Sequence, residues 1–222
     1  MVFDGHSDLL YDVTRCRLLG QTRVLERCHL PRLKKGSIEG LVLAIWANPE
    51  AGETYLQKET QILRCMTEEF SESPWLCPVR TAAEAKLAKN QGRLYAFLSV
   101  EGMAAIGEDL SGIDRYAELG IRLGMLTWNE ENALATGAKG DPQKGLSQLG
   151  KQAVRRMEQR GIIVDVSHLN SGGIHEILSM AQRPVIASHS NCSTGASRGC
   201  QAIKTRRMLS GAGVTVSFAV SV

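Results

Sequence analysis

The chain has 222 residues, of which 43% are hydrophobic and 22% are charged, so it can bury a sizeable core, and a disordered chain or a fibrous repeat is excluded. Its 26 Lys and Arg residues against 23 Asp and Glu residues give a net charge of +3, which offers no electrostatic reason to expect nucleic acid or an anionic membrane as partner. No apolar run approaches the roughly 20 residues of a membrane-spanning helix. The first residues also lack the basic segment and following apolar segment of a signal peptide.

Short apolar runs alternate with amphipathic segments along the chain. The apolar runs predict strands at residues 1–6, 40–47, 94–100, 122–127, 162–167, 185–188 and 214–220. Most of these runs are nearly continuous, as expected for parallel strands that are covered on both faces. The amphipathic segments predict helices at residues 53–70, at 81–90 with a capping box at its start, at 145–160 ended by Gly161, at 171–182 and at 204–210.

This repeated alternation of strands and helices indicates an α/β fold with parallel strands. The choice lies between an open doubly wound sheet and a closed (β/α)₈ TIM-type barrel. No glycine-rich phosphate loop follows the first strand, and metal-ligand side chains follow four strands, where barrel active sites are built. A barrel typically needs eight strands and about 250 residues. We therefore expect one barrel domain over residues 1–222, truncated before the eighth strand.

Five side chains at the carboxyl ends of these strands are of metal-ligand type. His6 and Asp8 lie two residues apart and can bind one ion together. His168 and His189 end successive strands, which lie about 5 Å apart in a parallel sheet, so they can converge on one ion. Glu101 has two carboxylate oxygens and could serve both ions.

Nitrogen and oxygen ligands without a thiolate suit two Zn²⁺ ions, with Mn²⁺, Co²⁺ or Fe²⁺ as substitutes. Two such ions about 3.5–4 Å apart can hold a water, lower its pKa and polarise a carbonyl, which is the chemistry of hydrolysis.

The remaining histidines and the cysteines receive structural interpretations. His29 is expected in a loop and His175 inside a helix, and a single histidine is more often structural than a ligand. The six cysteines contain no pair with CxxC spacing, which predicts reduced thiols and a cytoplasmic location.

The motifs around these residues resemble those of the renal (membrane) dipeptidase family, peptidase family M19 of the amidohydrolase superfamily. They are DGHSD at 4–8, LPRL at 30–33, SVEG at 99–102, LTWNEEN at 126–132, DVSH at 165–168 and IASHSN at 186–191. The resemblance implies a (β/α)₈ barrel with two zinc ions. His6, Asp8 and Glu101 would hold one ion, and Glu101, His168 and His189 the other.

The same resemblance implies the hydrolysis of dipeptides, often with a D-residue at the C-terminal side, by a hydroxide that bridges the metals at Glu101, the catalytic carboxylate. The acid–base aspartate that the family carries on its eighth strand would lie beyond Val222. Trp128 stands where the mammalian members have a substrate-contacting histidine. The family's carboxylate-binding arginine aligns with Cys200, and Arg198 stands two residues earlier.

Trp128, Asn129 and Arg198 are therefore the candidate substrate contacts, and Arg198 is either a carboxylate anchor or a solvated surface arginine. Two other functions stay open. The first is another amidohydrolase-type activity, such as that of a lactonase or an N-acyl-amino-acid deacylase. The second is a truncated, catalytically impaired metal-binding fragment, whose open barrel would leave strand edges unpaired and favour association, for example as a homodimer.

Overall fold

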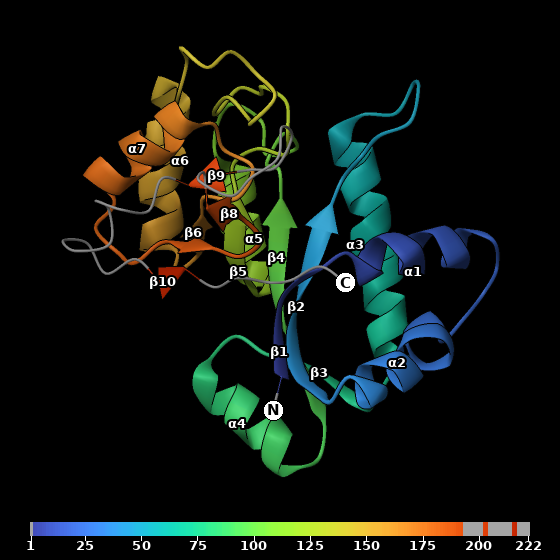
Figure 1. Ribbon diagram of the computed structural model, residues 1–222. Coiled ribbons are helices and arrows are strands. Elements are labelled where there is room, and N and C mark those ends of the chain that lie inside the picture. The colour runs from blue at the N-terminus through green and yellow to red at the C-terminus, as the bar shows by residue number, and fades with distance from the viewer. Residues whose placement is uncertain (1, 193–201, 204–214, 217–222) are drawn as a thin grey trace. The chain divides into compact units, whose positions relative to one another are not determined.

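The computed structural model in Figure 1 describes residues 2–192, 202–203 and 215–216. The chain divides into two compact units, a first unit of Met1–Val100 and a second unit of Glu101–Val222. That residues 1–222 form a single domain stays a prediction.

The sheet of the first unit contains the predicted strands near residues 1–6, 40–47 and 94–100. They are β1 (Val2–Ser7), β2 (Ile38–Trp46) and β4 (Leu94–Glu101), and the short β3 (Leu76–Pro78) is added at β4. The order is β1-β2-β4-β3, with β1 parallel to β2 and β3 parallel to β4. Six successive residues of β2 are buried, as the nearly continuous apolar run predicts for a strand covered on both faces.

The helices of this unit include both predicted ones, α3 (Tyr55–Ser71) and α4 (Ala82–Asn90). Each begins with a complete capping box, formed by Thr54 with Gln57 and by Thr81 with Glu84. Figure 1 shows α3 beside α1 (Leu9–Leu18), which the sequence analysis did not predict.

A π-helix, η1 (Leu25–His29), runs into α2 (Leu30–Lys35), so His29 ends a helix and does not lie in the predicted loop. The reason is Pro31, which stands in the first turn of α2, where its missing N–H costs no helical hydrogen bond. His29 Nε2 lies 2.8 Å from Asp12 Oδ2, a contact that joins η1 to α1.

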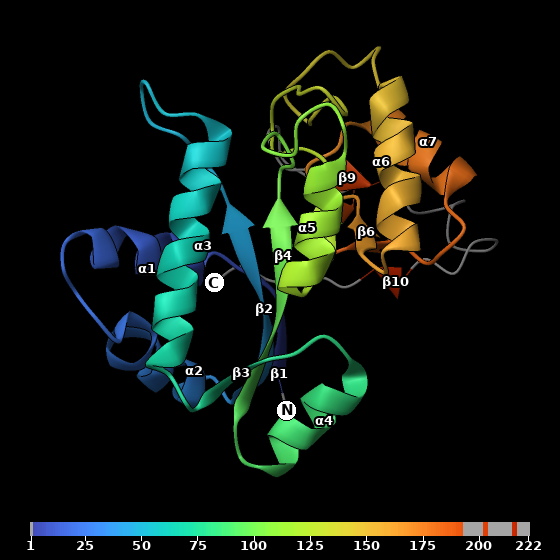
Figure 2. The same cartoon turned by 180° about the vertical axis from the view of Figure 1, so that it is seen from behind.

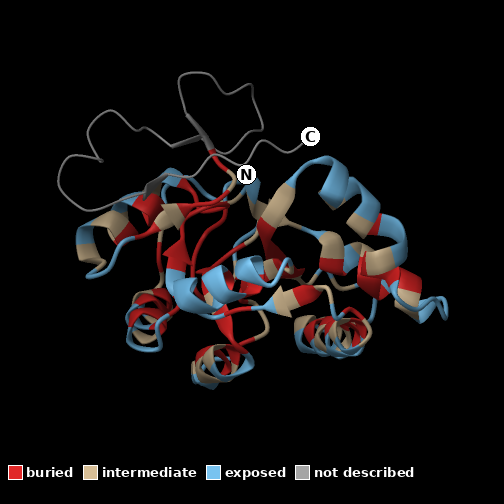
Figure 3. Cartoon of the chain, turned by 90° about the horizontal axis from the view of Figure 1, so that it is seen from below, coloured by how far each residue is buried: buried red, intermediate tan, exposed pale blue. Residues whose placement is uncertain are grey.

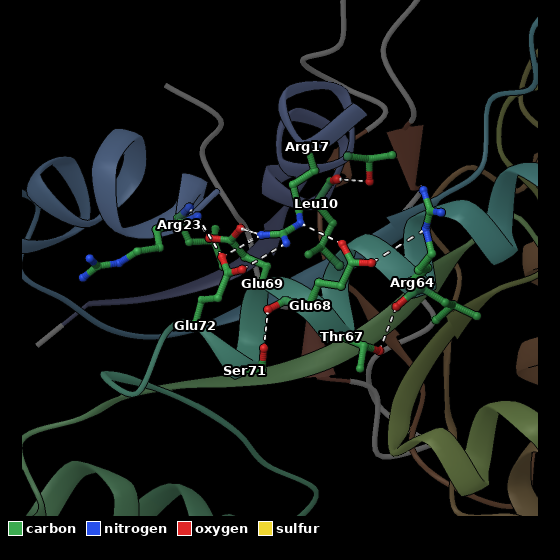
Figure 4. A network of polar contacts seen from close by, with 12 residues as sticks. Leu10, Arg17, Arg23, Arg64, Thr67, Glu68, Glu69, Ser71 and Glu72 are labelled. Carbon is green, nitrogen blue, oxygen red and sulfur yellow. Dashed lines mark hydrogen bonds and ion pairs between the residues drawn. The ribbon is translucent and has the colours of Figure 1, made fainter. Parts of the chain in front are cut away.

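A buried ion cluster joins α1 to α3 (Figure 4). Arg17 Nη1 lies 2.8 Å from Glu69 Oε2 and 2.9 Å from Glu72 Oε2, and Arg17 Nε lies 3.2 Å from Glu68 Oε2. Glu69 is fully buried and also accepts the backbone N–H of Leu25 at 2.7 Å. The hydrogen bond to Glu72 raises the pKa of Arg17, burial acts in the opposite direction, and the hydrogen bonds to Glu69 and Glu68 raise the pKa further. Arg17 in turn lowers the pKa of Glu72.

We expect the substitution Arg17→Met to lower the free energy of unfolding by about 3–5 kcal/mol, because it leaves the buried carboxylate of Glu69 without its cation. Urea denaturation followed by circular dichroism measures this change. The matched control is Arg15→Met, because Arg15 pairs with Asp12 at the surface and its loss should change stability little. Equal stability of the two variants would contradict the role assigned to the cluster.

The second unit continues the alternation with β5 (Ile121–Met125), β6 (Ile163–Asp165), β7 (Ile186–Ala187) and β10 (Thr215–Val216), parallel neighbours in that order. β8 (Asn191–Cys192) and β9 (Ala202–Ile203) form a separate parallel pair.

The strands β6 and β7 are shorter than predicted, because the Asp165 carboxylate receives the N–H groups of Ser167 and Ser188 where the ladder would continue. The predicted helix at 204–210 and most of the predicted strand at 214–220 lie outside the described residues.

In the described part of this unit, three helices accompany these strands: α5 (Ser111–Leu119), α6 (Gln148–Gln159) and α7 (Ser171–Met180). The sequence analysis predicted α6 and α7 but not α5. Figure 2 shows α5 beside α6, where Arg156 Nε lies 2.8 Å from Asp114 Oδ1. Gly161, with a φ of 72°, follows the end of α6 as predicted. Buried residues lie on the strands and on one side of these helices (Figure 3).

The parallel strand pairs and the intervening helices confirm the predicted α/β fold of the (β/α)-barrel type. Among the described residues, no helix is long and apolar enough to cross a membrane. In the described part of the chain, free thiols are found at Cys16, Cys28, Cys65 and Cys77.

Candidate metal centre

Three of the five predicted ligands come together in the second unit. Glu101 is the last residue of β4, His168 follows β6 and His189 follows β7. Glu101 Oε1 lies 2.6 Å from His168 Nε2 and 3.8 Å from His189 Nε2. The two Nε2 atoms lie 2.7 Å apart. The carboxylate is 5% exposed and the His189 side chain 21%, so the group is shielded but open at His189.

The backbone of His168 is held in an uncommon conformation. Its φ is 69°, in the left-handed region that a residue with a Cβ adopts at a cost. The N–H of Ala138 donates to the His168 carbonyl at 2.8 Å, and the hydroxyl of Thr127 donates to it at 3.4 Å. These contacts fix the turn that carries His168 beyond the end of β6.

Asn129 determines which nitrogen of His168 can bind a cation. Asn129 Oδ1 lies 3.1 Å from His168 Nδ1, and an amide oxygen only accepts hydrogen bonds, so Nδ1 carries the ring proton. In the neutral ring Nε2 then presents a lone pair to the Glu101 oxygen at 2.6 Å. Two facing lone pairs at this distance repel each other unless a proton or a cation lies beside them.

The spacing of the three ligand atoms is near what one zinc ion requires. Zn–N bonds of about 2.0–2.1 Å in tetrahedral geometry place ligand atoms roughly 3.3 Å apart. The separations of 2.6 and 2.7 Å are shorter than this value, and the separation of 3.8 Å is longer. Two imidazoles and one carboxylate are also a donor set that Zn²⁺ accepts, with Mn²⁺, Co²⁺ or Fe²⁺ as substitutes.

A fully buried carboxyl lies behind the two histidines. Asp165 Oδ1 accepts the N–H of Ser167 at 2.9 Å and the N–H of Ser188 at 3.2 Å. Burial raises the pKa of Asp165, and the hydrogen bonds from Ser188 and Ser167 act in the opposite direction. The sequence analysis quoted Asp165 and Ser188 within motifs but gave them no role. The available signal was their place just before a histidine, three residues before His168 for Asp165 and one residue before His189 for Ser188.

The other two predicted ligands belong to the first unit. His6 is the fifth residue of β1 and Asp8 directly precedes α1. His6 Nε2 lies 3.3 Å from Asp8 Oδ1, and the Asp8 side chain is 55% exposed. The two side chains therefore point toward each other, as their spacing of two residues predicts.

The predicted substrate contacts lie in different surroundings. The Trp128 ring lies 6.4 Å from the His168 ring and borders the metal centre. Asn129 contacts the Nδ1 atom of His168, on the side of the ring away from Glu101. Arg198 lies outside the described residues. Lys139, which the sequence analysis did not single out, places its Nζ 5.8 Å from the centroid of the Trp128 ring.

A glycine allows the segment that carries Lys139 to approach Trp128 so closely. A Cβ on Gly137 would lie 2.5 Å from the carbonyl oxygen of Trp128. The N–H of Lys139 donates to the Asn129 carbonyl at 2.8 Å and so closes this loop. Lys139 stands ten residues after Asn129 in the sequence, and no sequence pattern indicates that the chain folds back to bring the two together.

Comparison with known proteins extends this picture. Residues 1–198 match the model of the membrane dipeptidase family, peptidase family M19. An uncharacterized dipeptidase of Schizosaccharomyces pombe is 36% identical over 110 residues, which are 48% of this chain and 26% of that protein.

Two solved structures share the fold at 24% identity. A metallopeptidase described as dipeptidase AC of family M19 has a TM-score of 0.75 and covers 86% of this chain. A metallopeptidase from Rhodobacter sphaeroides, liganded with a phosphinate mimic of the dipeptide L-Ala-D-Ala, has a TM-score of 0.74 and also covers 86%. The chain spans 64% and 65% of these two proteins, and thus less than two thirds of their length.

We expect His168→Ala to weaken Zn²⁺ binding by at least about 100-fold, because loss of a ligand costs more than loss of a residue that only orients one. Competition with a chromophoric chelator measures the dissociation constant. His175→Ala is the matched control, because His175 is an exposed residue of α7. Equal affinity of the two variants would remove His168 from the set of ligands.

Proposed function

The chain belongs to peptidase family M19, the membrane dipeptidases, and on that premise we propose that it is a zinc-dependent dipeptidase. The observation that carries this proposal is the convergence of His168 Nε2, His189 Nε2 and Glu101 Oε1, with Asn129 holding the proton of His168 on the opposite nitrogen. A structural neighbour that holds a dipeptide mimic supports the same class of substrate.

The residues of the second unit would hold one ion. Glu101 contributes a negative charge that partly balances the cation, while the two imidazoles contribute neutral nitrogen ligands. When bound, a zinc ion lowers the pKa of a water and polarises a carbonyl, which are the two requirements of peptide hydrolysis. The assignment of His6 and Asp8, with Glu101, to a second zinc stays a prediction from the sequence.

Trp128 and Lys139 are the residues that we propose contact the substrate. The half-buried indole of Trp128 offers an apolar wall beside the centre, and the exposed ammonium of Lys139 lies over its ring. A dipeptide carries a free carboxylate one residue from its only peptide bond. A cation that binds this carboxylate would therefore select short substrates. Tolerance of a D-residue at the C-terminal side, a homodimer and a cytoplasmic location belong to the proposal as well.

The decisive assay compares hydrolysis of L-Ala-D-Ala, L-Ala-L-Ala, an N-acyl amino acid and a lactone by the zinc-loaded protein. We expect cleavage of the free dipeptides, and we expect Glu101→Gln to lower kcat/KM by at least about 100-fold, since it removes a ligand charge. Glu176→Gln is the matched control, because Glu176 pairs with Lys151 away from the centre. Cleavage of the lactone or the N-acyl amino acid alone would favour the other amidohydrolase activities and overturn the dipeptidase proposal.

We expect Lys139→Met to raise KM for dipeptides roughly 10-fold, about 1.4 kcal/mol, with little change in kcat. The reason is that the carboxylate anchor binds the ground state and the transition state alike. An amidated dipeptide lacks the carboxylate and should not discriminate between Lys139→Met and the wild type. Lys151→Met, which removes an ammonium that pairs with Glu176, is the control. A similar KM for all three proteins would exclude Lys139 as the anchor.

A further inference from the structure

The hydroxyl of Ser188 lies against the nitrogen of His189 that faces away from the metal centre. Ser188 Oγ is 2.8 Å from His189 Nδ1, and Ser188 is 2% exposed. The other nitrogen, Nε2, faces His168 and Glu101. A neutral imidazole carries one proton, so Nε2 can offer a lone pair to a cation only when Nδ1 carries that proton, and in this tautomer Nδ1–H donates to the Ser188 hydroxyl.

The neighbouring groups hold Ser188 itself in place. Its backbone N–H donates to Asp165 Oδ1, and its hydroxyl lies 3.5 Å from Ser167 Oγ. The N–H of His189 donates to Ser167 Oγ at 3.3 Å. Ser188 and His189, which follow β7, are therefore both hydrogen-bonded to side chains at the end of β6 and just after it.

Asp165 is the residue on which this arrangement depends. It is fully buried, and one of its oxygens receives backbone N–H groups from both segments, those of Ser167 and Ser188. Each of these serines directly precedes a histidine of the centre. The burial of a carboxyl group is costly, and the hydrogen bonds that partly offset this cost are the ones that join the segments carrying His168 and His189.

We propose that Asp165 and Ser188 are positioning residues of the metal centre. Ser188 holds His189 with its proton on Nδ1, and Asp165 holds the two strand ends at the separation that lets both Nε2 atoms bind one ion. This inference rests on the proposed zinc-dependent function, and it adds residues that touch neither the metal nor the substrate.

Glu158 provides a matched control for Asp165. It is also a buried carboxyl, 7% exposed, and its Oε1 accepts two backbone N–H groups, those of Gln182 at 2.7 Å and Arg183 at 2.9 Å. These residues precede β7, whereas Ser188 follows it. Removal of either carboxyl deletes two hydrogen bonds of the same kind, but only Asp165 lies at the end of the strand that carries a histidine.

The first experiment measures the Zn²⁺ dissociation constant and the thermal unfolding midpoint of the metal-free protein for Asp165→Ala and Glu158→Ala. Both variants should unfold at a lower temperature. We expect Asp165→Ala to bind zinc about 10–100-fold more weakly than the wild type, the loss typical of residues that orient metal ligands, and Glu158→Ala to retain its affinity. Equal affinities of the two variants would show that Asp165 only stabilises the fold.

The second experiment observes the ring nitrogens of His189 directly, by ¹⁵N NMR of the metal-free protein labelled at histidine, at a pH where the rings are neutral. The wild type should show the Nδ1–H tautomer. Ser188→Ala should gain the Nε2–H tautomer and bind zinc about 10-fold more weakly, and Ser188→Thr, which keeps a hydroxyl, should restore both. Retention of the Nδ1–H tautomer in Ser188→Ala would overturn the role of Ser188.

The outcomes also separate this inference from the proposed function. Zinc binding by the wild type together with unchanged variants refutes the inference and leaves the dipeptidase proposal intact. A wild-type protein with no zinc affinity refutes the proposed function and the role of Asp165 with it, while the tautomer measurement still decides the role of Ser188.

Discussion

The close approach of three electron-pair donors is the constraint on which the second unit depends. The Nε2 atoms of His168 and His189 and a carboxylate oxygen of Glu101 would repel one another as neutral rings and an anion in a shielded pocket. Hydrogen-bond partners on the opposite side of each ring hold the two histidines in place. Asn129 contacts the far nitrogen of His168, and Ser188 contacts that of His189. A cation held between the three atoms would remove this repulsion.

The support is built mainly from short polar side chains on strand ends, not from the hydrophobic core. β6 and β7 have only three and two residues, and their ladder is continued by the carboxylate of Asp165. A longer ladder would have used the same backbone N–H groups. The shortening of the strands and the fixation of the histidines are therefore two results of one set of hydrogen bonds.

The sequence predicted most of the strands because each is a nearly continuous apolar run, and β2 is the clearest case. It predicted the neighbouring positions of His168 and His189 because consecutive parallel strands end at the same edge of a sheet. It missed α1 because two of the buried residues of this helix, Thr14 and Cys16, are not strongly apolar and stand beside charged residues, so the sequence shows no clear apolar stripe. Nor could the sequence predict that Lys139 lies near Trp128, because this position depends on how the loop between β5 and α6 folds back and not on any periodic pattern.

The left-handed backbone of His168 has a consequence for the loop that borders the metal centre. The carbonyl of this one residue receives the N–H of Ala138, the neighbour of Lys139, while its ring is held by Asn129, the neighbour of Trp128. The loop between Asn129 and Ala138 is therefore fixed at both ends to one residue of the candidate metal centre, through the His168 ring at one end and the His168 carbonyl at the other.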